Sequence, residues 1–485
     1  MSKYEIKDGV GGIPEGATEV EYQAFSDCCN LISITIPDSV ITICDRAFKG
    51  CSNLETISIG RGVKQIDCDA FRGCSSLKNI KVVEGNPKYD SRNNCNAIID
   101  TEENRLILGC STTVIPDDIS RICNSSFEGC GELVSITIPN GVKTIGARAF
   151  FGCTNLKNVT LSNTLTTIEY SAFEDCCELS GITIPNGVTH IGLHAFRGCT
   201  SLLSVMIPES ISLIAPGAFE ECTSLNSLVV EKTNPIYDSR NNCNAIIETK
   251  TNKLIVGCGT TIIPNGVTEI YETAFLRCTS LTNITIPEGV LRIGLGAFYG
   301  CTSLEKLDIP KTVTTIKSSA FRGCTSLKSI TIPQNAIWIS DCLFEGCDSL
   351  RSIVVEEGNP QYDSRNNCNA IIDTEYNELI MGCAATIIPE GVKKIREKAF
   401  ANCSSLTSIV IPKGVKNIES HAFEKCLNLQ SITLPIGVRK IGEFAFCYCK
   451  SLQTIYVPAK KTDYYKQRLS TYLHSKIVEL DPVKK

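Results

Sequence analysis

The chain has 485 residues but little of what enzymes commonly use for catalysis. It contains only four histidines, one tryptophan and three methionines, and aromatic residues make up 7%. It has no Walker A, GxGxxG, GxSxG or HExxH motif. The usual sequence signals for nucleotide sites, hydrolase triads and zinc proteases are therefore absent.

The chain also lacks long apolar runs and a strong overall charge. No run of 18 apolar residues occurs, so we expect no membrane insertion. The start, MSKYEIKDGVGGIPEGATEV, has neither the basic residues nor the apolar core of a secretory signal. This favours a cytoplasmic location, unless a leader is missing. The net charge of −5 is too mild to favour nucleic acid, although residues 384–485 hold 17 Lys and Arg against 8 Asp and Glu.

What the chain does contain is a repeat. Fifteen phenylalanines, most of them in an Ala-Phe pair, recur at fixed intervals, and most neighbours in this series differ by 23 in sequence number. The three remaining intervals are longer than 23 residues and equal to one another, so an insert of constant length interrupts the repeat three times. These phenylalanines are Phe25, Phe48, Phe71, Phe127, Phe150, Phe173, Phe196, Phe219, Phe275, Phe298, Phe321, Phe344, Phe400, Phe423 and Phe446.

One repeat, from Ile138 to Leu161, reads IPNGVKTIGARAFFGCTNLKNVTL. The pattern LxxIxI alternates apolar and hydroxyl residues like a strand, and VxxI is a second short extended piece. No segment of the repeat is long enough for a full helix. Because a single repeat is too short to bury its own apolar face, the copies are expected to stack into a solenoid with parallel ladders.

The string LxxIxIP…AFxGC resembles the BspA-like leucine-rich repeat family of bacterial surface proteins, over residues 13–458. The resemblance implies a β-rich solenoid, an adhesin-like role and a place at the cell surface. We expect one solenoid over residues 1–458, with inserts at about 84–116, 231–264 and 356–389, and a C-terminal cap over 459–485. The N-terminus begins almost directly in a coil, with little to cover it.

The predicted cap has a helical pattern. Thr462 or Asp463 is expected to N-cap a helix, and a final strand is expected over 476–480. The helix would pack through an apolar stripe of Tyr465, Leu469, Tyr472 and Leu473.

Cysteine is abundant, with 28 residues, and fifteen of them follow a repeat phenylalanine by three positions. One cysteine in each coil forms a ladder of small buried residues, which is the wrong arrangement for zinc. We expect no metal or other cofactor.

Each insert carries the identical motif YDSRNNCNAII, at 89–99, 237–247 and 362–372. It precedes a strand, a four-residue turn and a second strand, so it acts as a junction that aims a projecting β-hairpin. In the predicted register two cysteines of each hairpin face each other, within disulfide range. A bridge would form in an oxidising compartment, and facing thiols would pack in a reducing one. The pairs are Cys95–Cys110, Cys243–Cys258 and Cys368–Cys383.

Four surfaces are candidates for binding. The outward row of the main strand carries hydroxyl residues and becomes apolar or aromatic toward Tyr456. Ile337 and Trp338 are large apolar residues at the two x positions of VxxI, which are polar in most coils. The inserts are the third candidate. The fourth is a basic stripe, stacked at the repeat spacing, that consists of Lys393, Lys416 and Arg439, with Lys394 and Lys440 beside it.

Similar coils present residues in rows, and rows make binding surfaces more readily than active sites. We therefore expect a non-enzymatic, monomeric interaction scaffold. By resemblance its partner is a host or bacterial surface protein. An intracellular scaffold or self-associating protein is the alternative, and polyanion binding through the basic stripe is a third, weaker hypothesis.

Overall fold

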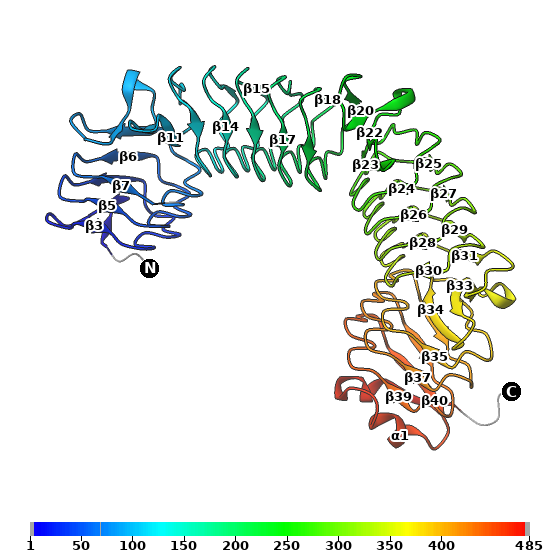
Figure 1. The fold of residues 1–485 in the computed structure, drawn as a ribbon. Helices are drawn as coiled ribbons and strands as arrows, with labels where there is room; N and C mark the ends of the chain where they lie inside the picture. Colours follow the sequence, from blue (N-terminus) through cyan, green and yellow to red (C-terminus); the bar gives the residue numbers. More distant parts are fainter. Residues whose placement is uncertain (1–3, 68, 481–485) are drawn as a thin grey trace. The chain divides into compact units, whose positions relative to one another are not determined.

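The computed structural model describes residues 4–67 and 69–480. The chain divides into two compact units, Met1–Ser239 and Arg240–Lys485. In each unit, short strands of successive coils pair in parallel and leave almost no helix (Figure 1). Each unit is therefore a β-solenoid of short repeated coils, and the fold class predicted from the repeat is confirmed.

The LxxIxI segment forms the main strand in every repeat except that of Phe173, where Gly181 makes an isolated bridge to Ser204. Neighbouring main strands pair in register one repeat apart, as Ser135 does with Asn158. In the N-terminal unit these strands are β4 (Ser33–Ile36), β6 (Thr56–Ile59), β8 (Asn79–Val82), β13 (Ser135–Thr137), β15 (Asn158–Thr160), β18 (Ser204–Ile207) and β20 (Ser227–Val230). In the C-terminal unit they are β25 (Asn283–Thr285), β27 (Lys306–Asp308), β29 (Ser329–Ile332), β31 (Ser352–Val355), β36 (Ser408–Val410), β38 (Ser431–Thr433) and β40 (Thr454–Pro458).

The VxxI segment forms a second, two-residue strand in each coil, and these strands build a second parallel sheet. In the N-terminal unit they are β3 (Glu19–Val20), β5 (Thr42–Ile43), β7 (Gln65–Ile66), β12 (Arg121–Ile122), β14 (Thr144–Ile145), β16 (Thr167–Ile168), β17 (His190–Ile191) and β19 (Leu213–Ile214). In the C-terminal unit they are β24 (Glu269–Ile270), β26 (Arg292–Ile293), β28 (Thr315–Ile316), β30 (Trp338–Ile339), β35 (Lys394–Ile395), β37 (Asn417–Ile418) and β39 (Lys440–Ile441).

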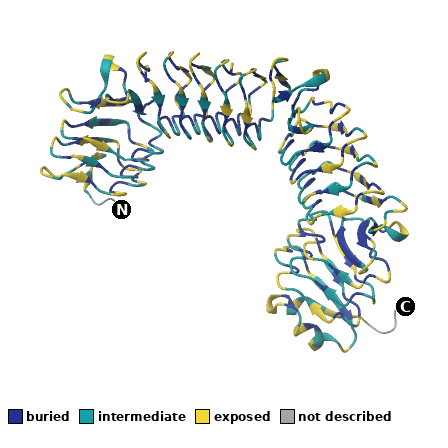
Figure 2. Cartoon of the chain, in the orientation of Figure 1, coloured by how far each residue is buried: buried dark blue, intermediate teal, exposed yellow. Residues whose placement is uncertain are grey.

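The core lies between the two sheets, where buried and exposed residues alternate along the strands (Figure 2). The repeat phenylalanines are buried in it and stack ring on ring between adjacent coils. Their centroids are 4.9–5.9 Å apart and the rings are nearly parallel. Each insert interrupts this stack, so the phenylalanines form separate columns.

The repeat cysteines fill the core and also donate hydrogen bonds. Fourteen of the fifteen repeat cysteines are buried. In eleven coils the Sγ lies 2.9–3.2 Å from the carbonyl oxygen of the preceding coil's phenylalanine, to which the thiol donates. Burial raises the pKa of the Cys176 and Cys199 thiols well above the ordinary value, so they remain protonated donors.

The N-terminus is capped, contrary to the expectation of a bare coil. Strands β1 (Ile6–Lys7) and β2 (Val10–Gly11) form an antiparallel hairpin, and β2 extends the main sheet by pairing with β4. The ring of Tyr4 stacks on Phe25, with centroids 5.4 Å apart. The hairpin was missed because both of its strands are very short.

The C-terminal cap consists of helix α1 (Thr462–Lys466), the 3-10 helix η4 (Thr471–Lys476) and strand β41 (Ile477–Leu480). Strand β41 pairs in parallel with β40 and ends the main sheet. The predicted final strand is therefore present. The predicted N-cap is wrong: Lys461 precedes the helix, and the Thr462 hydroxyl instead donates to Glu479.

Three residues of the predicted apolar stripe, Tyr465, Leu469 and Leu473, are buried in the core. The fourth, Tyr472, is 55% exposed. Its hydroxyl lies 3.4 Å from the carbonyl oxygen of Phe446. In other coils the next cysteine donates to this carbonyl, so Tyr472 ends the ladder of thiol hydrogen bonds.

Candidate functional site

The three inserts are built into the solenoid. In the first, β10 (Ile98–Asp100) pairs antiparallel with both β9 (Tyr89–Asp90) and β11 (Arg105–Leu108), and β11 pairs in parallel with β12. In the third, β33 (Ala370–Asp373) and β34 (Glu378–Gly382) pair with each other and with their neighbours β32 (Tyr362–Asp363) and β35 in the same way.

The hairpin of the second insert lies in the C-terminal unit, where β22 (Ala245–Glu248) pairs with β23 (Lys253–Gly257) and β23 pairs with β24. The remaining insert strand, β21 (Tyr237–Asp238), belongs to the N-terminal unit. In the first insert Ile98, Ile99 and Leu106 are completely buried. A projecting hairpin was therefore the wrong expectation, because both hairpin strands contribute to the core.

The cysteine pairs of the hairpins do not keep the predicted register. Next to the turn, Ile99 faces Leu106 as predicted, but a β-bulge then shifts Ile98 to face Leu108. In the third insert the same shift leaves Cys368 and Cys383 in separate hydrophobic clusters. All cysteines within the described residues are free thiols. The disulfides Cys95–Cys110, Cys243–Cys258 and Cys368–Cys383 thus remain a prediction. The two cysteines of each pair no longer face each other directly across the hairpin, which was the reason for predicting them.

An asparagine just before the motif fastens each insert to the preceding coil. The Asn86 side-chain amide donates to the carbonyl oxygens of Gly60 and Val63, at 2.8 and 3.0 Å. Its Oδ1 accepts the backbone N–H groups of Lys88 and Tyr89, at 2.9 and 2.8 Å. Asn234 and Asn359 make the same four bonds in their inserts.

Side chains of the motif accept hydrogen bonds from backbone N–H groups in the last strands before the insert. The Tyr89 hydroxyl accepts the N–H of Ile66, in the last strand of the second sheet, at 3.1 Å. The Ser91 hydroxyl accepts the N–H of Val82, in the last main strand, at 3.0 Å. Tyr237 and Ser239 repeat both contacts at 3.2 and 2.9 Å, and Ser364 repeats the second at 3.0 Å.

The asparagines of the motif supply backbone conformations that other residues resist. Asn93, Asn94 and Asn96 all have left-handed φ angles between 51° and 57°, which asparagine tolerates better than most residues. Arg92 pairs with Asp90 at 3.0 Å and reaches across the hairpin turn to Asn104 Oδ1 at 3.1 Å. Nearly every letter of the motif therefore has a structural role in the junction.

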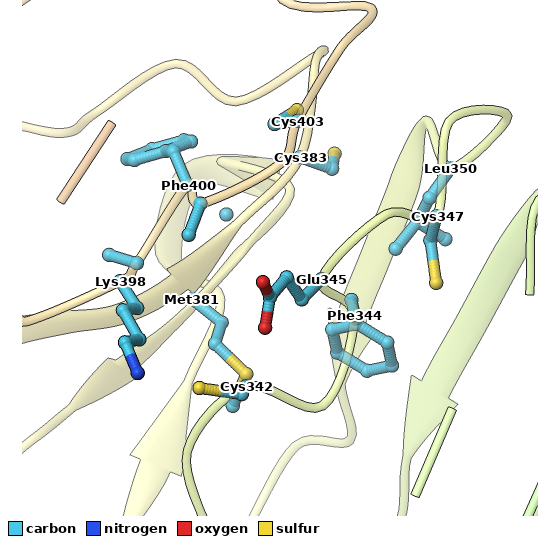
Figure 3. A pocket seen from close by; sticks show the side chains of 13 residues that line it. Cys342, Phe344, Glu345, Cys347, Leu350, Met381, Cys383, Lys398, Phe400 and Cys403 are labelled. Atoms are coloured by element: carbon cyan, nitrogen blue, oxygen red, sulfur yellow. The ribbon is translucent and has the colours of Figure 1, made fainter. Parts of the chain in front are cut away.

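A glycine closes each insert against the next phenylalanine column. A Cβ added to Gly109 would lie 2.2 Å from the Phe127 ring, and Gly257 and Gly382 show the same clash with Phe275 and Phe400. Figure 3 shows this junction in the third insert, where Met381 and Glu345 lie between the two phenylalanine columns. The remaining cavity is only about 20 Å³.

The outward face of the main strands carries the predicted rows. Ser135 and Thr137 pair with Asn158 and Thr160, and all four side chains are exposed. Beside the first insert this face has an open recess of about 610 Å³, lined in part by Val114, Thr137 and Thr160. Its lining is neutral or weakly polar apart from Asp117.

Toward the C-terminus this face becomes apolar, as predicted. Val410, Thr433, Tyr456 and Val478 are in register on β36, β38, β40 and β41. Val410 is 66% exposed, and Tyr456 is half-buried. The row thus presents aliphatic and aromatic side chains to solvent on a regular sheet.

The basic stripe is stacked as predicted. The N–H of Lys416 donates to Lys393 O, and the N–H of Arg439 to Lys416 O, at 2.8 and 2.7 Å. The neighbouring row is less basic than it looked, because Lys394 forms salt bridges with Glu378 and Glu419, at 2.6 and 3.2 Å. The hydrogen bond that Lys394 donates to Glu378 contributes most to raising the pKa of Lys394. Lys393, Arg439 and Lys440 are exposed.

Trp338 is 69% exposed. It lies on β30, the last second-sheet strand before the third insert, in register with Thr315. The insert contacts the backbone of Ile337 through the Tyr362 hydroxyl, at 3.4 Å. The insert therefore does not bury the indole ring.

An exposed aromatic group at the last coil escaped the sequence analysis. Phe444 and Tyr448 are 53% and 60% exposed, and they flank the Phe446 corner to which Tyr472 donates. The Phe444 ring stacks on His421 at 5.3 Å, and Lys425 Nζ lies 5.9 Å from the Tyr448 ring. Comparison of equivalent repeat positions would have found them, because only the last coil places aromatic residues in both slots.

The model of the BspA type leucine rich repeat region matches residues 12–99, 111–245, 256–371 and 379–479. The chain therefore belongs to this family, whose repeat proteins are generally protein-interaction scaffolds. The gaps between the matched segments all overlap the hairpins of the inserts. No curated protein matches the chain.

Several solved leucine-rich repeat structures are similar. One from Eubacterium ventriosum is 21% identical and covers 73% of this chain and 92% of its own, with a TM-score of 0.47. One from Bacteroides ovatus is 24% identical, covers 99% and 98%, and has a TM-score of 0.36. A leucine-rich cell surface protein from Faecalibacterium prausnitzii is 23% identical, covers 94% and 89%, and has a TM-score of 0.33.

Neither a membrane-spanning helix nor a metal-binding group occurs among the described residues. No helix there is long and apolar enough to cross a membrane. Nor does this part of the chain hold a group of three or more His, Cys, Asp or Glu side chains arranged for a metal ion.

Proposed function

We propose that this chain is a non-enzymatic, adhesin-like scaffold that binds a host or bacterial surface protein. The observation that carries the proposal is the row of Val410, Thr433, Tyr456 and Val478 on the outward strand face, in which only Thr433 is neither aliphatic nor aromatic. Aromatic and aliphatic residues that are exposed in register on a rigid sheet are typical of protein interfaces. The family supports a scaffold, since its members generally bind proteins.

The arrangement also favours binding over catalysis. Each described surface repeats similar residues from coil to coil, as in the Ser135–Asn158 and Thr137–Thr160 pairs. Catalysis requires unlike groups that converge on one reacting atom. The recess beside the first insert is lined mainly by aliphatic, hydroxyl and amide side chains.

A double variant tests the binding face. Val410→Ser with Tyr456→Ser should reduce binding of the labelled protein to host or bacterial cells roughly tenfold or more, because buried aromatic contacts dominate interface energies. The matched control is Met206→Ser with Val229→Ser, an exposed apolar pair in register on the same kind of face in the other unit. Equal losses in both variants, or no loss in either, would contradict the assignment.

Location separates an adhesin from an intracellular scaffold. Protease treatment of intact native cells should release peptides of this chain if it acts at the surface. If peptides appear only after lysis, the intracellular scaffold becomes the better proposal.

The stacked side chains of Lys393, Lys416 and Arg439 support a second candidate, binding of an acidic polymer. Like charges at this spacing repel one another, and a polyanion would relieve the repulsion. Retention on heparin should decrease with salt and be lost when these three residues, with Lys394 and Lys440, are neutralised. Retention that ignores salt would exclude this function.

A further inference from the structure

The N-terminal end of the repeat stack is acidic. Residues 4–45 contain eight Asp and Glu but one lysine, Lys7. Glu5, Asp8, Glu15 and Glu19 are exposed, and they lie on or beside β1 and β3, the first strands of the two sheets. The exposed side chains of Val10 and Tyr22 lie in the same segment. This end therefore combines negative charge with apolar surface.

The C-terminal end is basic. Residues 439–480 contain eight Lys and Arg but only three acids. Lys440, on the last strand of the second sheet, is exposed, as are Lys450 and Lys460 on either side of β40. Exposed Val478 lies on β41, the last strand of the main sheet. The C-terminal end thus also combines charge with apolar surface, but its net charge is positive.

The aromatic residues of the last coil are not explained by the coil itself. Phe444 and Tyr448 have left-handed φ angles of 57° and 58°, a conformation that bulky residues rarely adopt. The two preceding coils hold polar residues at these positions, namely Lys398, Asn402, His421 and Lys425. Both rings remain half exposed, although Phe444 stacks on His421, so a contact outside the chain would bury the remaining aromatic surface.

We propose that copies of this chain associate head to tail, with the basic, aromatic C-terminal end of one copy against the acidic N-terminal end of the next. The net charges are −7 for residues 4–45 and +5 for residues 439–480. Opposite charges on matching apolar surfaces direct encounter and select orientation. The contact joins two different surfaces, so it propagates as a chain or closes as a ring. It goes beyond the proposed function and replaces the monomer expected from the sequence.

Two charge-reversal variants test the contact. Variant A carries Glu5→Lys, Glu15→Lys and Glu19→Lys, which changes the net charge of residues 4–45 from −7 to −1. Variant B carries Lys440→Glu, Lys450→Glu and Lys460→Glu, which makes both ends acidic. Sedimentation equilibrium of the unaltered chain should show association that increases with concentration and weakens from about 50 to about 500 mM salt, because salt screens exposed charges.

Each variant alone should associate roughly tenfold or more weakly than the unaltered chain, while a mixture of A and B should associate again. Restoration in the mixture excludes misfolding as the cause of the losses. Phe444→Ser with Tyr448→Ser should weaken association at both salt concentrations. An unaltered chain that stays monomeric, or a mixture that behaves as the sum of its parts, would overturn the proposal. Because purified protein alone is used, neither result depends on the surface-protein partner.

Discussion

Replacing Cys176 by alanine and by serine tests whether the cysteine ladder donates hydrogen bonds or only fills space. Its Sγ lies 3.2 Å from the carbonyl oxygen of Phe150, and the residue is fully buried. Cys130 is the matched control, because it occupies the same repeat position and is also buried. Its thiol has no hydrogen-bond partner within residues 4–67 and 69–480.

The structure sets the expected magnitudes. Alanine at position 176 removes a buried group of methylene size, worth about 1 kcal/mol, and a hydrogen bond worth about 0.5–1 kcal/mol. Serine there retains a donor aimed at the Phe150 carbonyl, so it should cost no more than alanine. At position 130 a serine hydroxyl would be buried without a partner, which adds about 1–3 kcal/mol relative to alanine.

Hydrogen exchange of peptides that cover residues 150–199 and 127–153, together with urea denaturation, measures the local and total effects. The prediction is an inversion: serine at least as stable as alanine at position 176, but less stable than alanine at position 130. If serine is worse than alanine by the same amount at both positions, the thiols act only as small apolar residues. The hydrogen-bonding role of the ladder would then be refuted.

Three further predictions concern the first insert and the coil that follows it. Gly109→Ala should destabilise the chain by about 1–3 kcal/mol because its Cβ meets a phenylalanine ring at 2.2 Å, whereas Gly131→Ala, with its nearest atom at 3.6 Å, should be nearly neutral in thermal unfolding. Asn86→Ala removes four hydrogen bonds and should cost about 2–4 kcal/mol in urea denaturation, and Asn86→Asp, which keeps the two accepted bonds, should cost less. Burial opposes ionisation of Glu128, but the hydrogen bonds from Arg148 hold the pKa of Glu128 below its ordinary value of 4.5. The ionised Glu128 therefore stabilises the fold above pH 4.5, and this stabilisation is lost as the pH falls through the lowered pKa. Glu128→Gln should flatten that part of the profile of melting temperature against pH.

Periodic features were predictable because stacking converts sequence spacing directly into contact. The repeat spacing placed Phe150 on Phe173 and Lys393 beside Lys416, and the structure confirms both. The same reasoning predicted the register next to the hairpin turn, where Ile99 faces Leu106. The predicted register fails at the cysteines because a β-bulge inserts one extra residue into one strand, and this changes every later pairing.

The candidate site was only partly predictable, because exposure depends on what packs nearby. The sequence marked Trp338 as unusual for its slot, and only the folded insert shows that the indole is left uncovered. Lys394 was counted in a basic stripe, yet Glu378, brought beside it by the insert, neutralises it. Tyr472 was assigned to the core from helical spacing, but the cap turns there into a 3-10 helix.

The sequence by itself determined the family, the length of the repeated coil, the columns of Phe and Cys, and the positions of the three inserts, since all of these follow from periodicity. Only the tertiary structure decided that the insert hairpins are part of the sheets and do not project from them. It also decided that the repeated thiols donate to carbonyl groups, and that the motif's Tyr89 and Ser91 accept hydrogen bonds from the last strands before the insert. The physical reason is that a hydrogen-bonding group is satisfied by whatever lies beside it in space. At an interruption of the repeat, spacing along the chain no longer says what that neighbour is.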